Sequence, residues 1–396
     1  MDTLTAAKAI EKDIVSIRRE IHMYPEIGLE TPRTSALVAR LLRDLGVEVR
    51  ERVGGYGVVG LIRGEVPGPA KVVALRADMD ALPVNEETGK DYASKVPGAM
   101  HACGHDAHVA MLLGASRVLS EMRNRFSGAV KLIFQPGEEG AGGAKYMIDD
   151  GCLEDPKPDI MFGLHVGTLW SAKAGQVGVR SGALMAASDS FVIEVHGKGG
   201  HGAAPHLSVD PVVISAQIVT ALQTIVSREV DPIAPAVVTV GKIEAGTARN
   251  IIPETCTMLG TVRYIDRVLK DYIPARIRDI AGGVAASMRA EARVEYKYGY
   301  PPLVNDRSAT EFLARSAASL VGPDNVLEVQ PTMGGEDMAY YLERVPGTFF
   351  SLGSAGSDPS TWYPNHHPKF DIDESVLPLG AAVLAQACLD FLGQSG

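Results

Sequence analysis

A chain of 396 residues is long enough to form two domains with large hydrophobic cores. Its formal net charge of −10 leaves no basic excess to neutralise phosphates, which argues against nucleic acid as a partner. Hydrophobic residues (46%) and charged residues (22%) occur at ordinary globular levels.

The four cysteines lie far apart, which is no disulfide framework for a chain of this size. No apolar run approaches the roughly 20 residues needed to span a bilayer. The first 20 residues lack the continuous apolar core of a signal peptide. We therefore expect a soluble, cytoplasmic protein without a membrane partner.

Helical and strand-like patterns alternate through the first 180 residues. Apolar residues at three-to-four spacing predict helices over residues 5–23, 34–45 and 107–119. Runs of β-branched and apolar residues predict strands over residues 47–53, 58–62, 72–75, 130–134 and 160–166. This alternation is typical of an α/β fold in which helices cover a sheet.

The pattern changes near Ser181. Strands are predicted over residues 188–195, 236–243, 255–264 and 293–298, and helices over about 211–229 and 267–290. The order β-α-β-β-α-β is that of the ferredoxin-like, or split βαβ, arrangement. An α/β pattern then returns, with helices over 309–320 and 377–391 and a strand over 348–352. We therefore predict an α/β, mixed-sheet domain of residues 1–182 and 297–396, with a ferredoxin-like domain of residues 183–296 inserted into it.

Residues 100–108, Met-His-Ala-Cys-Gly-His-Asp-Ala-His, contain three histidines, one cysteine and one aspartate. A packed core does not need that density of ionisable groups. The segment follows a predicted strand and opens a predicted helix, where α/β sheets commonly place their sites. Cys103 and His105 are the best candidates for metal ligands. The alternatives are that Cys103 is a small buried hydrophobe and that His101 and His108 are structural.

Similar candidates occur at the C-terminal ends of predicted strands or in the loops beyond them: Glu138, Glu139, His165, and His366 or His367. A thiolate, several imidazoles and a carboxylate exceed what one tetrahedral ion needs, so two divalent ions that share a water molecule are plausible. Neighbouring side chains on an extended segment point in opposite directions. One of the two glutamates can therefore bind metal while the other acts as general base. Taken singly, a glutamate pair could be ordinary surface and His165 a core histidine.

Together these motifs resemble the dinuclear-metal amidohydrolases of the peptidase M20 type. That family includes hippurate hydrolases, plant indole-acetyl-amino-acid hydrolases, aminoacylases and archaeal broad-specificity carboxypeptidases. The resemblance runs from Arg18 to His366. Its most specific parts are LRADMDALP (75–83), HACGHD (101–106), FQPGEE (134–139), GKGGH (197–201) and GED (335–337).

The resemblance implies five ligands for two divalent metal ions: Cys103, His105, Glu139, His165 and His366. The cysteine favours Zn²⁺, whereas the carboxylates tolerate Mn²⁺, Co²⁺ or Ni²⁺. The resemblance also implies that Glu138 is the general acid/base and that Asp80 orients part of the metal shell.

The resemblance further implies that the inserted domain is a lid and dimerisation domain, giving a homodimer or homotetramer. His201 would donate a hydrogen bond to the oxyanion, often from the partner subunit's lid. Asn250 and Arg263 match positions that hold the substrate carboxylate or the reacting carbonyl, and arginine can bind both oxygens of a carboxylate. From the residues alone, all three could be loop or edge residues on an ordinary surface.

The chain departs from the family pattern at two positions. His366 is followed by His367 where the family usually has Asn or Ser, so either histidine could be the last ligand. Met338 occupies a position where Phe is common, which leaves the acyl-group preference open.

We predict a metal-dependent enzyme that hydrolyses the amide bond of N-acyl-L-amino acids, a small-molecule substrate, with carboxypeptidase activity as a further activity. One alternative is a dipeptidase for unblocked peptides, which would need an acidic group to recognise the free amine. Another is a metal-binding scaffold without catalysis, which the complete ligand set and Glu138 disfavour.

Overall fold

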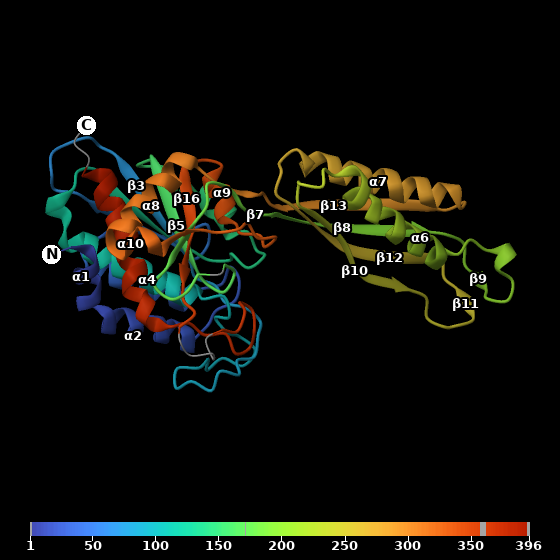
Figure 1. Cartoon of the computed structure of the whole chain (residues 1–396). Coiled ribbons are helices and arrows are strands. Elements are labelled where there is room, and N and C mark those ends of the chain that lie inside the picture. The colour runs from blue at the N-terminus through green and yellow to red at the C-terminus, as the bar shows by residue number, and fades with distance from the viewer. Residues whose placement is uncertain (1, 171, 357–361, 394–396) are drawn as a thin grey trace. The chain divides into compact units, whose positions relative to one another are not determined.

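The computed structural model describes residues 2–170, 172–356 and 362–393. The chain divides into two compact units, residues 1–184, 304–331 and 337–396, and residues 185–303 and 332–336. It passes between them along β7 (Gly182–Met185) and β14 (Leu303–Asn305), which form a two-stranded sheet. The predicted class, a mixed-sheet α/β fold with an inserted α+β unit, is confirmed (Figure 1).

The first unit is built on an eight-stranded sheet with the order β1-β2-β4-β3-β5-β16-β6-β15. Its strands are β1 Glu48–Val53, β2 Gly57–Arg63, β3 Val72–Asp78, β4 Ala129–Gln135, β5 Ile160–Gly167, β6 Val177–Val179, β15 Val326–Glu328 and β16 Gly347–Gly353. The central strands β4, β3, β5 and β16 are parallel, whereas β1, β2 and β6 bring in antiparallel pairings. Because the central strands are buried along their length, most of their residues are apolar on both faces of the sheet.

Helices pack around this sheet and complete the core of the first unit. They are α1 Thr3–Ala9, α2 Glu11–Met23, α3 Pro32–Asp44, α4 His105–Glu121, α5 Gly143–Asp149, α8 Arg307–Val321, α9 Met338–Leu342 and α10 Leu377–Leu392. Helix α4 packs against α10 and is buried along most of its length. Two described segments, Pro211–Glu229 and Glu374–Leu392, have the length and hydropathy of a membrane span. Within the most apolar part of the second segment, 78% is buried inside the protein, as expected of a core helix.

The prediction of a single helix over residues 5–23 is wrong, because in the structure the helix is broken at Ile10 into α1 and α2. Ile10 leaves helical geometry (φ −110°, ψ 15°), and its N–H bonds back to Ala7. No glycine or proline marks the break, and the apolar spacing continues across it. The break follows from tertiary packing, since α1 packs mainly on α10 whereas α2 packs mainly on α4.

The second unit has the ferredoxin-like topology. Its strands and helices follow in the order β8 Ala187–His196, α6 Pro211–Thr224, β10 Ala236–Ala245, β12 Thr255–Tyr264, α7 Leu269–Ser287 and β13 Glu291–Tyr300. The antiparallel sheet has the order β10-β12-β8-β13. A small additional sheet pairs β9 (Gly200–His201) with β11 (Ile251–Ile252). Alternate residues of β8 are buried, so one face of the sheet packs on the helices.

Candidate metal centre and active site

Three neighbouring parallel strands bring several of the candidate site residues to one edge of the sheet. The register pairs Asp78, the last residue of β3, with Gln135, the last residue of β4. The loops beyond these residues carry Asp80 and the pair Glu138–Glu139, and His165 lies near the end of β5. Because the carboxyl ends of parallel neighbours meet at the same edge, residues far apart in sequence lie side by side.

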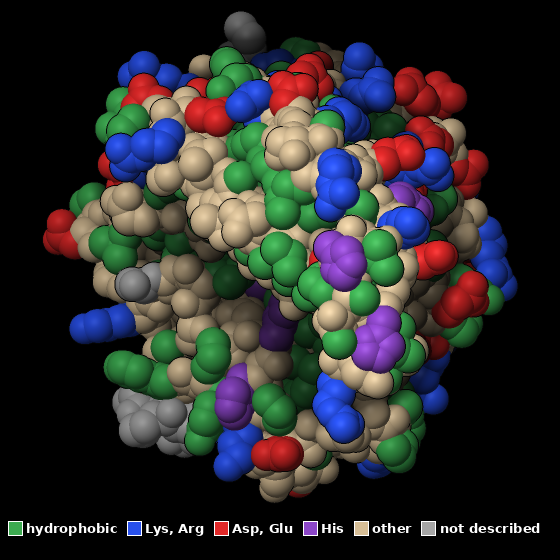
Figure 2. All heavy atoms as spheres, turned by 90° about the vertical axis from the view of Figure 1, so that its right-hand side faces the viewer, with side chains coloured by type: hydrophobic (Ala, Val, Ile, Leu, Met, Phe, Trp, Pro, Cys, Tyr) green, Lys and Arg blue, Asp and Glu red, His purple; other side chains and the backbone are tan. Residues whose placement is uncertain are grey.

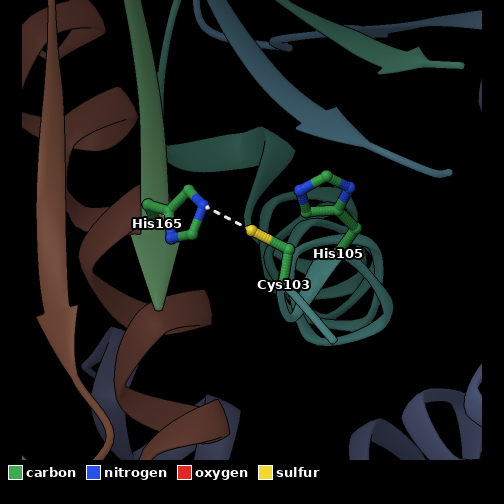
Figure 3. A group of neighbouring side chains, drawn as sticks. All are labelled: Cys103, His105 and His165. Atoms are coloured by element: carbon green, nitrogen blue, oxygen red, sulfur yellow. Dashed lines mark hydrogen bonds between the residues drawn. The ribbon is translucent and has the colours of Figure 1, made fainter. Parts of the chain in front are cut away.

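Helix α4 begins at this edge, and a glycine permits its first residues to approach β5. Gly104 is the N-cap residue with φ +90°, a conformation that favours glycine. A Cβ atom on Gly104 would lie 2.5 Å from Cγ2 of Val166. The close approach places Cys103 Sγ 3.5 Å from His165 Nε2, with His105 beside them (Figure 3).

The candidate ligand atoms form overlapping groups within which all ligand atoms lie within 4.8 Å of one another. Three of these groups are Cys103–His105–His165, Cys103–Glu139–His366 and His105–Glu138–Glu139. The Cys103 sulfur belongs to two of them, so one thiolate could serve both ions of a dinuclear centre. The arrangement can therefore hold two divalent ions close together.

His366 rather than His367 faces this cluster. His366 Nε2 lies 3.4 Å from Glu139 Oε1, and its backbone N–H bonds to the carbonyl of Ala102 at 2.7 Å. The ring of His367 stacks on Tyr363, and its Nδ1 accepts the backbone N–H of Lys369. Of the two candidates left open by the sequence, His366 is the one that lies among the other candidate ligands.

Hydrogen bonds indicate which nitrogen of each buried histidine is free to bind a cation. His165 Nδ1 lies 2.6 Å from the carbonyl of Val166, and His105 Nδ1 lies 2.8 Å from the carbonyl of Asp80. In the neutral ring, each Nδ1 therefore carries the proton, and Nε2 keeps its lone pair. His108 differs, because its Nδ1 donates to Asp78 and its Nε2 accepts the N–H of Val166. His108 has no free nitrogen, which fits the structural role considered for it.

Buried acids and an arginine surround the cluster. Asp80 accepts the backbone N–H groups of Glu138 and Glu139, and thereby fixes the loop that carries both. Asp78 lies 3.6 Å from His105 Nε2 and accepts Arg76 Nη1 at 2.6 Å. Burial opposes the charge of Asp78, yet Arg76 and the histidines hold its pKa well below the usual range.

The donor set fits divalent cations. Two of its buried atoms, His105 Nε2 and Glu139 Oε1, have no hydrogen-bond partner among the described residues. Buried polar atoms normally find a partner, so such atoms at a shared point indicate a missing ligand. Burial, with a smaller contribution from Glu139, raises the pKa of the Cys103 thiol to about 12. A bound cation would favour the thiolate and satisfy both free atoms.

The second unit brings together two of its three candidate residues. His201 pairs with Ile251 across β9 and β11, and the N–H of Gly202 bonds to the carbonyl of Asn250. His201 Nδ1 accepts the N–H of Ala203, so the neutral ring carries its proton on Nε2 and can donate it. His201 is exposed, and histidines are visible on the face seen in Figure 2, the side where β9 and β11 lie in Figure 1.

Arg263 lies elsewhere, near the opposite end of β12. It is opposite Ser188 at the start of β8, whereas Thr255 is opposite His196 at the end of β8. Arg263 Nη1 bonds to the hydroxyl of Thr261 and the carbonyl of Val262. Within one chain, therefore, the second unit does not group Arg263 with His201 and Asn250.

Sequence reasoning missed two residues at this edge. Asp78, which the sequence analysis did not single out, contacts both His105 and His108. Asn365 Nδ2 bonds to the carbonyls of Cys103 and Val166, and its Oδ1 accepts the N–H of Thr168. Their signals were the Asp-Met-Asp spacing and the position of Asn365 just before His366. Both were visible but could not be distinguished from ordinary turn residues.

The first unit is a mixed α/β unit with thiol, imidazole and carboxylate groups clustered at the edge of its sheet. This combination defines a class of enzyme, the metal-dependent hydrolases. Residues 74–390 match the model of Peptidase family M20/M25/M40, and the chain belongs to this family. It is 44% identical to Thermostable carboxypeptidase 1 of Saccharolobus solfataricus, covering 97% of this chain and 96% of that one. It is 43% identical to N-acetyl-L-cysteine deacetylase of Bacillus subtilis, covering 93% and 85%.

The fold comparison agrees with the sequence comparison. A solved Bacillus subtilis structure, described as a dinuclear metal binding peptidase from the M20 family, matches with a TM-score of 0.84. It is 33% identical and covers 97% of this chain and 99% of that one. The protein is therefore an enzyme of the M20 peptidase and amidohydrolase family, and two divalent metal ions are its expected cofactors.

Proposed function

We propose that this protein hydrolyses the amide bond of N-acyl-L-amino acids. The observation that carries the proposal is the ligand cluster at the sheet edge, with Glu138 beside it. Glu138 is buried, and its Oε2 lies 3.9 Å from His105 Nε2. An N-acyl amino acid is also the substrate in the name of one relative, N-acetyl-L-cysteine deacetylase.

Cys103, His105, Glu139, His165 and His366 would hold the two ions, with Zn²⁺ as the first choice and Mn²⁺, Co²⁺ or Ni²⁺ as alternatives. Two such ions lower the pKa of a shared water molecule and polarise a carbonyl group. Cys103 and the histidines are the ligands that favour zinc, whereas Glu139 suits any of the four metals.

Glu138 would accept a proton from the attacking water on a carboxylate oxygen while the water oxygen bonds to the acyl carbon. The same carboxyl group would then protonate the leaving nitrogen as the C–N bond breaks, releasing a carboxylic acid and a free amino acid. Asp80 holds the Glu138 backbone in place for both transfers. His201 would donate its Nε2 proton in a hydrogen bond to the carbonyl oxygen as negative charge develops there. Asn250 and Arg263 would bind the substrate carboxylate or the reacting carbonyl.

The positions of His201 and Asn250 support a proposal that they act on a second subunit. The chain enters and leaves the second unit next to the start of β8 and the end of β13. His201 and Asn250 lie beyond the other ends of these strands, after His196 and before Thr255. Strand β10 pairs only with β12 among the described residues, and it exposes Val237 and Ile243. We infer that this unit is the lid and dimerises through the β10 edge, giving a homodimer or a homotetramer.

Complementation tests the contribution of His201 from a partner subunit. Glu138→Gln and His201→Ala homodimers are each expected to be nearly inactive. After mixing and subunit exchange, a mixed dimer contains one site with an intact Glu138 and an intact His201 only if His201 acts on the partner's site. Recovery of activity supports that arrangement. Verified subunit exchange without recovery contradicts it.

The central experiment compares wild type, Glu138→Gln and chelator-treated enzyme on hippurate and N-acetyl amino acids. Loss of a general base should lower kcat by about 10²–10⁴-fold while the metal content stays unchanged. Chelation should abolish activity, and added Zn²⁺ or Mn²⁺ should restore it. Full activity in Glu138→Gln or in metal-free protein would contradict the mechanism.

A second candidate function is carboxypeptidase or dipeptidase activity on short unblocked peptides. It is favoured by the 44% identity to a protein named as a thermostable carboxypeptidase. A panel that pairs each N-acetyl amino acid with the matching unblocked dipeptide separates the two functions. Preference for blocked substrates supports the first proposal, and preference for unblocked substrates supports the second. Because all four cysteines are buried and free, we infer that the enzyme acts in the reducing cytoplasm.

A further inference from the structure

Arg18 on α2 is a fully buried arginine whose guanidinium joins three acids from different segments. Its Nε donates to Asp106 at 2.7 Å, its Nη2 to Asp371 at 2.9 Å and its Nη1 to Glu374 at 3.1 Å. The side chain of Arg18 is 0% exposed. These acids offset the cost of burial and raise the pKa of Arg18 well above its usual value, so the group stays charged. A buried charge of this kind demands fixed partners.

Two of these acids adjoin residues that we assign to the metal centre. Asp106 directly follows His105 in the first turn of α4. Asp371 lies five positions after His366 and is fixed further by the hydroxyl of Tyr92 at 2.7 Å. Arg18 therefore links the start of α4 to the segment that carries His366.

The segment that carries His366 must be held in place by other parts of the fold. His366 has φ +72°, a left-handed conformation that a non-glycine residue adopts only when its surroundings hold it there. One constraint is the backbone bond from His366 to Ala102. Others are the bonds of the neighbouring Asn365 to the carbonyls of Cys103 and Val166. Asp371 and Glu374 in addition bond to α2, through Arg18 and Arg19.

We propose that Arg18 is a positioning residue that sets the spacing between the Cys103–His105 segment and His366, and thereby the affinity of the metal centre. The inference depends on the proposed function, because it takes these residues as ligands. Arg18 is not one of the proposed metal ligands or substrate-binding residues. It acts through Asp106 on one side and through Asp371 and Glu374 on the other. The Cys103–Glu139–His366 group depends on both segments, so it should respond more than the Cys103–His105–His165 group.

The neighbouring Arg19 offers a matched control. It lies on the same helix and also bonds to Glu374, at 2.6 Å, but its side chain is 39% exposed. Among the described residues Arg19 forms an ion pair with Glu374 alone, so it does not link the two segments. A lysine at position 18 keeps the charge but cannot place three donors in the fixed fork of a guanidinium.

The experiment measures Zn²⁺ binding to metal-free wild type, Arg18→Lys and Arg19→Met by competition with a chromogenic chelator. We expect wild type to bind two ions per chain and Arg18→Lys to bind one of them about 10–100-fold more weakly, as for other residues that orient ligands. Arg19→Met should match wild type. Asp371→Asn, which leaves α2 unaltered, should weaken the same ion and provides a second route to the answer. Denaturant unfolding of each metal-free variant is measured in parallel.

A purely structural role would lower the stability of metal-free Arg18→Lys and leave both dissociation constants unchanged, and this result would overturn the inference. Equal weakening in Arg19→Met would also overturn it, because any loss of a helix charge would then suffice. If wild type binds no divalent ion, the proposed function itself fails. If wild type binds two ions and hydrolyses substrate while Arg18→Lys and Asp371→Asn bind both ions normally, only the inference about Arg18 fails.

Discussion

The carboxylate of Asp80 accepts the backbone N–H of Glu138 at 2.8 Å through Oδ1, and its second oxygen accepts the N–H of Glu139 at 3.0 Å. The carbonyl oxygen of Asp80 also lies 2.8 Å from His105 Nδ1. Asp80 thus fixes the positions of the proposed general base Glu138 and the proposed ligand Glu139. It also sets the tautomer of His105, another proposed ligand. Side chains that orient a site in this way affect its chemistry without touching substrate.

Replacing Asp80 by asparagine should lower kcat by about 10–100-fold, because an amide N–H₂ would face one of the two backbone N–H groups. Steady-state kinetics with measured metal content is the test. Asp159→Asn is a matched control, since Asp159 accepts the backbone N–H of Val72 at 2.7 Å on the strand that leads to this edge. Equal kcat in the Asp80 and Asp159 variants would argue against a special role for Asp80.

The variants His366→Ala and His367→Ala should differ clearly in metal content. His366 Nε2 lies 3.4 Å from Glu139, whereas the ring of His367 stacks on Tyr363. We expect His366→Ala to lose one ion and most of its activity, and His367→Ala to keep both ions. Metal analysis after gel filtration gives the answer. The reverse pattern would assign the ligand to His367.

Gly104→Ala should destabilise the protein by about 1–3 kcal/mol through its positive φ, with an added cost from its neighbour. The new Cβ would lie 2.5 Å from Val166 Cγ2. Gly89→Ala is the control, since Gly89 also has a positive φ (+67°) but open space around it. Urea unfolding of both variants isolates the contribution of the clash. A Gly104 variant no less stable than the Gly89 variant would show that β5 and α4 can move apart at little cost.

The free energy of unfolding should rise with pH because of the titration of the Lys131 amine. This side chain is buried in β4 and donates to the carbonyls of Cys152 and Glu154. Burial lowers its pKa from 10.5 to about 8. Between these values the unfolded chain binds more protons than the folded chain, so the free energy of unfolding increases with pH.

The comparison is between wild type and Lys131→Met, both free of metal. From pH 7.5 to 9.5 the free energy of unfolding of wild type should gain roughly 2 kcal/mol relative to the variant, because other titrations cancel in the difference. Urea unfolding at several pH values measures it. A difference that is flat, or that falls with pH, would contradict a depressed pKa at Lys131.

The sequence was most informative where a local pattern determines the outcome. The apolar runs of β3, β4 and β5 and the β-α-β-β-α-β order of the second unit could be predicted, because burial and alternation follow residue by residue. The break at Ile10 could not be predicted, because it depends on which helices α1 and α2 meet.

For the candidate site, the residue types of the candidate ligands and the location of Glu139 and His165 beyond or near strand ends came from the sequence alone, since parallel strands must bring their carboxyl ends to one edge. The position of His366 near Glu139, the contact of Asp78 with His105, and the link from Arg18 to Asp106 and Asp371 came only from the tertiary structure. Chain spacing carries no information about which of two adjacent side chains turns inward. Nor does it show which acids, in one case 353 positions away, a buried arginine will meet. The distances between these side chains are set by the packing of the whole core.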